Sequence, residues 1–361
     1  MAGERAEASS GNGEASGSGD ALARSLEDAA YWRELLGGLR IDDGRAWTKS
    51  DLNLESVDGG DVSVARRRIL DDGYCQVSPG KVCALDATFE SLRRGVEELK
   101  RLGWHASFIF LYDEAWVLAG RMAQLMRGVS GNEISYDMLA WHVDHEKGES
   151  GFSPHRDRQP DNVGDTFRSD GMAKYATCWL PLTRASPENS CLYVIPRRHD
   201  QGYERGDFLD GSDADPLAVA LHRKEAYQHI TALPTEAGGC LLFTHRIIHW
   251  GSSGRMATRE EEVAKAEVAA PRVSVSIGFS DPTYERPYLR GQPRIEVGAS
   301  LPPFRVRLAL ICAQMISYFE RFPTDKRLFA RFYKVFASEA DLFDEAYVTN
   351  TKEVREKERE K

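Results

Sequence analysis

The chain has 361 residues, 42% of them hydrophobic, and a formal net charge of -9 at pH 7. A chain of this length and composition can bury a sizeable core, and a single all-β barrel commonly exceeds about 200 residues. The negative charge argues against nucleic acid or an anionic membrane as the main partner. No run of about 18 apolar residues occurs, so the sequence predicts no membrane-spanning helix.

The six cysteines predict a reducing compartment, such as the cytoplasm. They stand at positions 75, 83, 178, 191, 240 and 312, without a Cys-x-x-Cys pair. Several lie inside apolar runs, where cysteine behaves as a small buried hydrophobic residue.

The N-terminal part is predicted to be helical after a disordered tail. Residues 1–20 are rich in Gly, Ser, Ala and Glu and lack the apolar content needed for a core. Apolar side chains at helical spacing predict helices over 22–39, 85–102 and 115–127, the first of them ending at Gly37 and Gly38. We expect these helices to flank a β-structure within a single domain over 21–350.

Strands dominate the prediction from Glu133 to Phe279, and this region contains the spacing of a metal site. His155 and Asp157 stand two residues apart, so on an extended segment their side chains point the same way. His249 ends an apolar run that breaks at glycine, as expected at the rim of a barrel. Two imidazoles and one carboxylate form the facial triad of non-haem Fe(II) oxygenases, which leaves coordination positions open for a 2-oxo acid and dioxygen.

The segment 272–279 alternates strictly between two faces. Its apolar face, predicted to be buried, consists of Val273, Val275, Ile277 and Phe279. Arg272 shares the other face with small residues only, and its planar guanidinium suits a carboxylate held by two hydrogen bonds. Together with the triad, Arg272 is predicted to bind the distal carboxylate of 2-oxoglutarate, with Ser274 donating a second hydrogen bond.

The C-terminal part is predicted to be helical again. Apolar residues at helical spacing predict a helix over 304–322 that packs on the core, with a dimer contact as the alternative interpretation. Residues 351–361 alternate in charge without apolar content and are predicted to form a solvated helix or a frayed tail.

Beyond the metal motif, several segments resemble the phytanoyl-CoA dioxygenase family of Fe(II)/2-oxoglutarate oxygenases. Residues 69–77, an acidic-Gly-Tyr sequence leading into a strand, are similar to the segment with which the family's domain begins. Residues 177–183 and 188–199 are similar to the family's run that passes through Asn-Gly-Cys-Leu and ends at Pro-Gly-Ser-His. The resemblance extends over about residues 65–285, in the family's order.

This resemblance implies a mainly β fold with flanking helices. The core would be a double-stranded β-helix, a cupin-like jelly-roll barrel, over about residues 133–285. The residues that match the family's iron ligands are His155, Asp157 and His249. Those that match its 2-oxoglutarate contacts are Arg272 and Ser274, with Trp179 and Met138 near the cosubstrate. For Trp179 and Met138, ordinary core packing is an equally good interpretation.

The chain departs from the family pattern at three places. Trp250 stands directly after His249, where the family has a Gly-Ser-like pair, so a serine contact to the cosubstrate from that position is in doubt. Asn189-Ser190 replaces Asn-Gly in a turn, where Asn tolerates a left-handed conformation. A charged, Ala-rich insertion over 255–270 is interpreted as a surface loop, a short helix or a lid.

We interpret the chain as an Fe(II)/2-oxoglutarate-dependent dioxygenase. It would oxidise a small-molecule substrate, favouring hydroxylation, and release succinate and CO2. One alternative is a non-catalytic barrel binding protein; another is a cupin-like metalloenzyme that does not use 2-oxoglutarate. A zinc-protease site at His245 and His249 is disfavoured, because the position of the glutamate base is occupied by Arg246. His245 could serve either core packing or substrate contact.

Overall fold

The structure is a computed structural model that describes residues 21–52, 59–82, 85, 87–160, 162–209, 212–213, 215–254, 270–291, 294–322 and 324–359. Two predictions, the disordered tail over 1–20 and the lid or loop over 255–269, lie outside these residues. Within the described part, no helix is long and apolar enough to cross a membrane.

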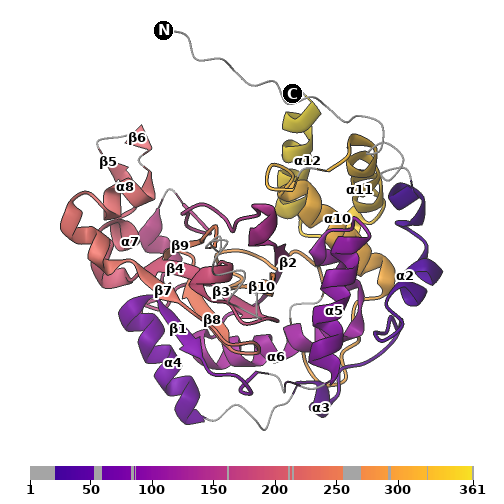
Figure 1. The fold of residues 1–361 in the computed structure, drawn as a ribbon, viewed down its shortest axis with the longest axis horizontal. Coiled ribbons are helices and arrows are strands. Elements are labelled where there is room, and N and C mark those ends of the chain that lie inside the picture. Colours follow the sequence, from indigo (N-terminus) through magenta and orange to yellow (C-terminus); the bar gives the residue numbers. More distant parts are fainter. Residues whose placement is uncertain are drawn as a thin grey trace, which may run out of the picture.

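The helices and strands alternate irregularly along the chain (Figure 1). The helices are α2 Ala29–Leu35, α3 Lys49–Leu52, α4 Gly59–Asp72, α5 Ala87–Arg101, α6 Asp113–Ser130, α7 Gly202–Arg205, α8 Pro216–Ala220, α10 Phe304–Ser317, α11 Lys326–Ser338 and α12 Glu345–Arg359. The strands are β1 Tyr74–Val77, β2 Glu133–Val143, β3 Tyr175–Pro181, β4 Leu192–Ile195, β5 Phe208–Leu209, β6 Ser212–Asp213, β7 Thr231–Leu233, β8 Cys240–Thr244, β9 Ile248–Gly251 and β10 Arg272–Ser280. A 3₁₀ helix, η1, covers Ala106–Leu111.

Two antiparallel sheets form the centre of the molecule. The larger sheet has the strand order β1-β8-β3-β10-β2, and the smaller has the order β7-β4-β9. Apolar side chains from both sheets meet in one cluster, to which the larger sheet contributes Trp179, Leu241 and Phe243 and the smaller Leu192, Val194 and Leu233. The sheets therefore pack face to face.

The outer face of the larger sheet is covered by helices. Along β10 the predicted apolar face lies in the same core cluster as residues of α5, α6 and α10, which confirms the alternation read from the sequence. Figure 1 shows α5 and α10 on one side of the sheets and α7 and α8 on the other. Arg272 and its small neighbours consequently face the interior between the sheets.

The description as mainly β is overstated, because 46% of the structure is helical. The strands are short, and the C-terminal region contains α11 in addition to the predicted helices. The sequence 326–338 has apolar residues at helical spacing, and in α11 these are buried: Leu328, Phe332, Val335 and Phe336. This amphipathic pattern is visible in the sequence alone.

The helices predicted over 85–102 and 115–127 are confirmed as α5 and α6, and the one over 304–322 ends early, at Ser317 in α10. The helix predicted over 22–39 is interrupted at Asp28. Its carboxylate accepts hydrogen bonds from the backbone N–H groups of Ala30 and Tyr31, at 2.9 and 3.3 Å, and so begins α2. Aspartate competes with the backbone inside a helix and is favoured at its N-terminus. At the other end, α12 continues through the predicted tail to Arg359, with Thr351 buried.

Candidate metal centre

The three predicted ligands come from two segments that run antiparallel. His155 and His249 exchange two backbone hydrogen bonds, 3.1 and 3.0 Å long, and the Asp157 N–H donates to the His245 carbonyl at 3.1 Å. His249 lies on β9, as expected for a ligand from another strand. His155 and Asp157 lie on an extended segment joined to β9 by an isolated bridge rather than on a regular strand.

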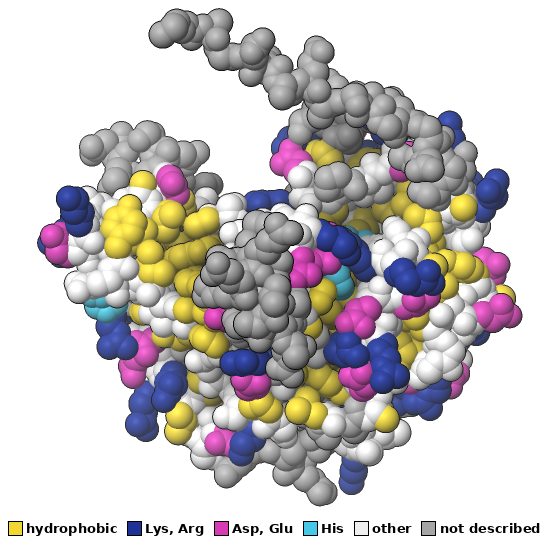
Figure 2. All heavy atoms as spheres, viewed as in Figure 1, with side chains coloured by type: hydrophobic (Ala, Val, Ile, Leu, Met, Phe, Trp, Pro, Cys, Tyr) yellow, Lys and Arg dark blue, Asp and Glu magenta, His cyan; other side chains and the backbone are white. Residues whose placement is uncertain are grey.

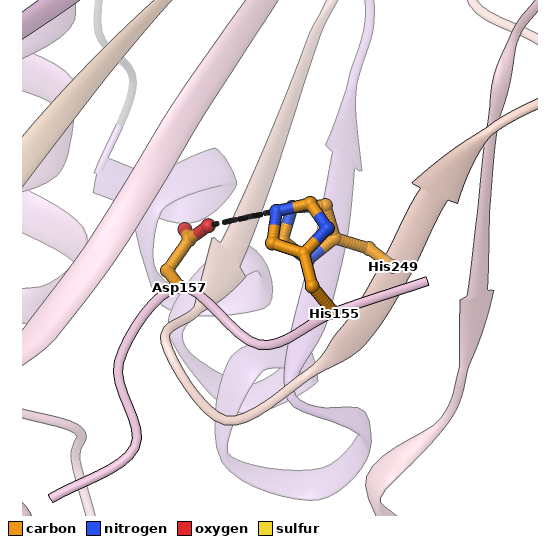
Figure 3. Close-up of side chains that lie close together, drawn as sticks. All are labelled: His155, Asp157 and His249. Carbon is orange, nitrogen blue, oxygen red and sulfur yellow. Dashed lines mark ion pairs between the residues drawn. The ribbon is translucent and has the colours of Figure 1, made fainter. Parts of the chain in front are cut away.

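The side chains of these residues converge (Figure 3). The Nε2 atoms of His249 and His155 lie 3.5 and 3.7 Å from Oδ1 of Asp157. One ligand atom from each residue falls within 4.8 Å of the others, which is the spacing of a metal-binding cluster. Two nitrogens and one carboxylate oxygen are the donor set of the facial triad.

Hydrogen bonds fix the orientation of each ligand. His155 Nδ1 lies 2.7 Å from the Ser153 carbonyl oxygen, and His249 Nδ1 lies 3.1 Å from the carbonyl oxygen of Ile247. A neutral imidazole that donates from Nδ1 keeps its Nε2 lone pair for a metal. The Thr177 hydroxyl donates to Asp157 Oδ2 at 2.5 Å, so Oδ1 is the oxygen left toward the histidines.

Electrostatics favour the metal-ready protonation state. Burial lowers the pKa of His249 to about 4, so this imidazole is neutral at pH 7. Burial alone would raise the pKa of Asp157, but the two histidines and the Thr177 hydroxyl outweigh it, and the pKa lies below its ordinary value. The triad therefore presents an ionised carboxylate and a neutral distal imidazole at neutral pH.

Behind the triad lies a buried ion-pair cluster that sequence reasoning missed. The Arg156 guanidinium, in the residue between the two ligands, pairs with Asp200 and Asp207 at 2.6 Å each, and the Arg156 and Asp200 side chains are fully buried. The Asp207 carboxylate also lies 3.3 Å from Arg246. A Cβ on Gly202 would lie 2.2 Å from Asp207 Oδ1, so only glycine fits there. We call these four charged residues the arginine clamp.

The clamp connects both ligand-bearing segments to α7. Arg246 donates from Nη2 to the Gly202 carbonyl at 2.8 Å, while Arg156 also donates to the Arg246 carbonyl. Burial opposes the charge of Arg156, but Asp207 and Asp200 outweigh it and raise the pKa of the guanidinium. No sequence periodicity signals this cluster, because Arg156 lies 44 and 51 residues from its two carboxylates.

Arg272 is also a buried arginine, but its surroundings differ from those of Arg156. It is 3% exposed at the start of β10, and among the described residues its Nε has no hydrogen-bond partner. Burial lowers the pKa of Arg272 to about 10, so the group is still a cation at pH 7. The hydroxyls of Ser274 and Ser190 are likewise buried without a partner in the described part. This arrangement fits a carboxylate ligand, which would supply the missing acceptors.

Trp179 and Met138 lie on different sides of the larger sheet. The Arg272 guanidinium carbon lies 5.7 Å from the Trp179 ring centroid, and Trp179 lines the interior cavity together with Arg272. Met138 is paired with Ile277, and directly opposed residues share a face, so it points into the helix-covered core instead. The geometry gives no support to the prediction that Met138 contacts the cosubstrate.

One further expectation is corrected, and one open alternative is decided. The left-handed residue in the turn before β4 is Ser190, with φ of 74°, and not Asn189. Asn189 instead donates to the carbonyls of Arg184 and Ala270 at 2.8 and 2.9 Å. His245, whose role was left open, is fully buried; its ring nitrogens lie 3.1 Å from the Tyr175 carbonyl and 2.8 Å from the Thr166 hydroxyl. Its role is in packing.

The triad, Arg272 and Trp179 line one cavity of about 1020 Å³. Figure 2 shows histidine side chains at the bottom of a hollow whose margin carries charged side chains. The outer walls come from the start of η1, from β2 and from the region of α10 and α11, segments that lie far apart in the chain. The volume is sufficient for a cosubstrate and a small organic molecule together.

Comparison with known proteins assigns the family. The family described as Phytanoyl-CoA dioxygenase (PhyH) matches residues 72–257, slightly more than half of the chain. The chain belongs to the phytanoyl-CoA dioxygenase family. Members are Fe(II)/2-oxoglutarate-dependent oxygenases acting on small molecules, so this phytanoyl-CoA dioxygenase family protein is an oxygenase that uses iron and 2-oxoglutarate.

Solved structures give weaker similarities. The non-heme alpha ketoglutarate dependent epimerase SnoN from nogalamycin biosynthesis has 19% identity and a TM-score of 0.42, over 68% of this chain and 96% of that one. EctD from S. alaskensis, solved with 2-oxoglutarate and 5-hydroxyectoine, has 16% identity and a TM-score of 0.43, over 73% and 91%. Comparison with curated proteins gives no match. Family membership therefore rests on the family match, and the substrate of this chain is not indicated by these similarities.

Proposed function

We propose that this protein is an Fe(II)/2-oxoglutarate-dependent dioxygenase that hydroxylates or otherwise oxidises a small molecule. One oxygen atom of O2 would enter the substrate, and the other would enter succinate formed by oxidative decarboxylation of 2-oxoglutarate, with loss of CO2. The observation that carries the proposal is the buried Arg272, which has no carboxylate partner in the described part of the chain and lines the cavity that also contains the triad. A buried cation without a counter-ion is costly unless a ligand supplies the charge.

Each residue is assigned a part in this reaction. His155, Asp157 and His249 would hold iron, which when bound activates dioxygen for oxidation of the substrate. Arg272 would bind the distal carboxylate of 2-oxoglutarate, with Ser274 donating a hydrogen bond and Trp179 packing beside it. Thr177 would orient the Asp157 carboxylate, and the apolar interior between the sheets would exclude water. The two facing sheets support assignment of the barrel as a double-stranded β-helix, within one domain over residues 21–350.

The test is turnover of 2-oxoglutarate. Protein loaded with Fe(II) is exposed to oxygen and 2-oxoglutarate, and succinate is measured for the unchanged protein, Asp157→Ala and Arg94→Gln. Arg94 is a suitable control because it lies on α5, outside the cavity lining, with a side chain 72% exposed. We expect succinate from the unchanged protein and from Arg94→Gln and none above background from Asp157→Ala. Equal succinate from all three, or none from the unchanged protein, would contradict the proposal.

A further inference from the structure

An aromatic wall leads from the metal centre into the outer cavity. The Phe152 ring lies edge-on to the ligand His155, at 5.5 Å between centroids, and edge-on to Trp141 at 4.5 Å. The ring centroid of Trp141 lies 5.2 Å from that of Phe322, and the ring centroid of Phe322 lies 4.1 Å from that of His105. All of these side chains line the cavity. The wall therefore begins at the metal centre and offers ring faces and edges along its length.

The rings of the wall come from four parts of the fold. Trp141 is on β2, where its indole N–H donates to Ser276 on β10 at 3.2 Å, so its orientation is fixed by the sheet. Phe152 stands three residues before the ligand His155, and Phe322 follows the end of α10. A ring bound against Phe152 would consequently lie beside the metal centre.

One cation of the cavity lies over a ring of the aromatic wall. The cations that line its described part are Lys100, Arg158, Arg272 and Arg321. The Lys100 ammonium lies 2.8 Å from a Glu149 oxygen, and Arg158 is paired with two carboxylates at 2.8 and 3.2 Å. Arg272 is assigned to the cosubstrate. The Arg321 guanidinium carbon lies 4.8 Å from the Phe152 ring centroid, so this cation stands against the aromatic wall.

The carboxylate nearest after Arg321 in the chain is engaged by the backbone. Asp325 accepts hydrogen bonds from the N–H groups of Arg327 and Leu328, at 2.9 and 3.3 Å, and so begins α11. A guanidinium held over an aromatic ring at the cavity wall can donate hydrogen bonds to an anionic group of a ligand.

We infer that the substrate carries a planar ring system and an anionic group. The ring packs against Phe152 and Trp141, and the anion binds Arg321, which together hold the ring beside the metal centre. This inference rests on the proposed function, since it takes the same cavity to hold the substrate. Phe152, Trp141 and Arg321 are then residues that determine substrate specificity.

Three matched probes test separately whether the substrate needs a planar ring and whether it needs an anionic group. 2-Naphthoate has the ring and the charge, 2-naphthylmethanol has the ring without the charge, and decahydro-2-naphthoate has the charge without aromaticity. Binding is measured by calorimetry without oxygen, on protein loaded with Fe(II) and 2-oxoglutarate, so that the Arg272 site is already filled. The variants are Arg321→Gln and Phe152→Leu, with Arg94→Gln and Phe319→Leu as controls outside the cavity lining.

We expect 2-naphthoate to bind about tenfold or more tightly than either analogue. Its advantage over the alcohol should disappear in Arg321→Gln, and its advantage over the saturated acid should disappear in Phe152→Leu, while both controls keep both preferences. Equal affinity for all three probes, preferences unchanged in the two cavity variants, or 2-naphthoate binding weaker than about 1 mM would overturn the inference. Failure of the proposed function is distinguishable, because the visible charge-transfer band of the Fe(II)–2-oxoglutarate complex is recorded before any probe is added.

Discussion

Arg156 and Arg272 are both buried arginines beside the same metal centre, yet their surroundings are opposite. Arg156 is paired with two carboxylates in a fully enclosed cluster, and its pKa is raised. Arg272 has no carboxylate partner among the described residues, and its pKa is lowered to about 10. The comparison indicates that a buried guanidinium with its own counter-ions maintains the structure, whereas one without them is kept for a ligand.

Arg156 and Arg272 also have different relations to the triad. The arginine clamp fixes the backbone of both ligand-bearing segments against α7, and it faces away from the cavity. Arg272 lines the cavity instead. Stability should therefore depend on Arg156 and cosubstrate affinity on Arg272.

The largest expected effect comes from breaking the clamp. Arg156→Met leaves Asp200 and Asp207 buried without their main partner, so we expect the free energy of unfolding of the metal-free protein to fall by about 3–5 kcal/mol. Urea unfolding measures this. Adding Asp200→Asn and Asp207→Asn to the same chain should recover part of the loss. A loss below about 1 kcal/mol for Arg156→Met would place the clamp among ordinary surface ion pairs.

Removing the other guanidinium should affect binding instead. Arg272→Met would delete the two charge-assisted hydrogen bonds that we propose to 2-oxoglutarate, so the Kd of the cosubstrate should rise by about 100-fold, equivalent to about 3 kcal/mol. The free energy of unfolding without cosubstrate should stay within about 1 kcal/mol of the unchanged protein or increase, because an unpaired buried charge is removed. Calorimetric titration and urea unfolding of the same preparation measure both quantities. If Arg272→Met lowered the free energy of unfolding as much as Arg156→Met, the proposed difference between a structural and a ligand-binding arginine would be contradicted.

The pH dependence of stability extends the comparison to buried histidines. Burial lowers the pKa values of His105 and His245 to about 3. As pH falls from 6.5 toward 3, the unfolded chain binds these protons and the folded chain does not. The metal-free protein should thus lose up to about 1.4 kcal/mol per pH unit for each histidine, with this stability fully present above pH 6.5. Unfolding of His245→Gln across this range should show a shallower slope; an unchanged slope would indicate that His245 is protonated in the fold.

The smallest expected effect concerns the orientation of one ligand. Thr177→Val removes the hydroxyl that donates to Asp157 Oδ2 while keeping a similar volume. Loss of such a hydrogen bond to a metal ligand typically weakens metal affinity by about 10–100-fold, and we expect the lower end because the carboxylate remains. Anaerobic Fe(II) titration is the measurement, with Thr183→Val as a control outside the cavity lining. Equal Fe(II) affinity in both variants would show that the hydroxyl has no part in orienting Asp157.

The metal centre could be predicted from the sequence because its signals are local or periodic. His155 and Asp157 are two residues apart, and Arg272 stands out on a strand whose alternation is complete. For Met138 the sequence left cosubstrate contact and core packing open, since family spacing does not say which face a residue occupies. The face is decided by the pairing of Met138 with Ile277, and this pairing is known only once the register of the two strands is known.

The clamp and the aromatic wall have no signal in the sequence, whereas part of the helical content does. Arg156 and its carboxylates carry no spacing rule, because their contact depends on how the segment around α7 folds back onto the ligand segment. The wall joins residues of four segments far apart in the chain. The C-terminal helices, in contrast, had a readable amphipathic pattern in α11.

The most direct test of the central claim is an anaerobic titration of the Fe(II)-loaded protein with 2-oxoglutarate. It follows the weak visible charge-transfer band that appears when a 2-oxo acid chelates iron at a facial triad. We predict a saturable band for the unchanged protein, a band that needs about 100-fold more 2-oxoglutarate for Arg272→Met, and no band for Asp157→Ala. Absence of a band in the unchanged protein, or an equal titration for Arg272→Met, would contradict the assignment of the triad and Arg272 as the iron and 2-oxoglutarate site.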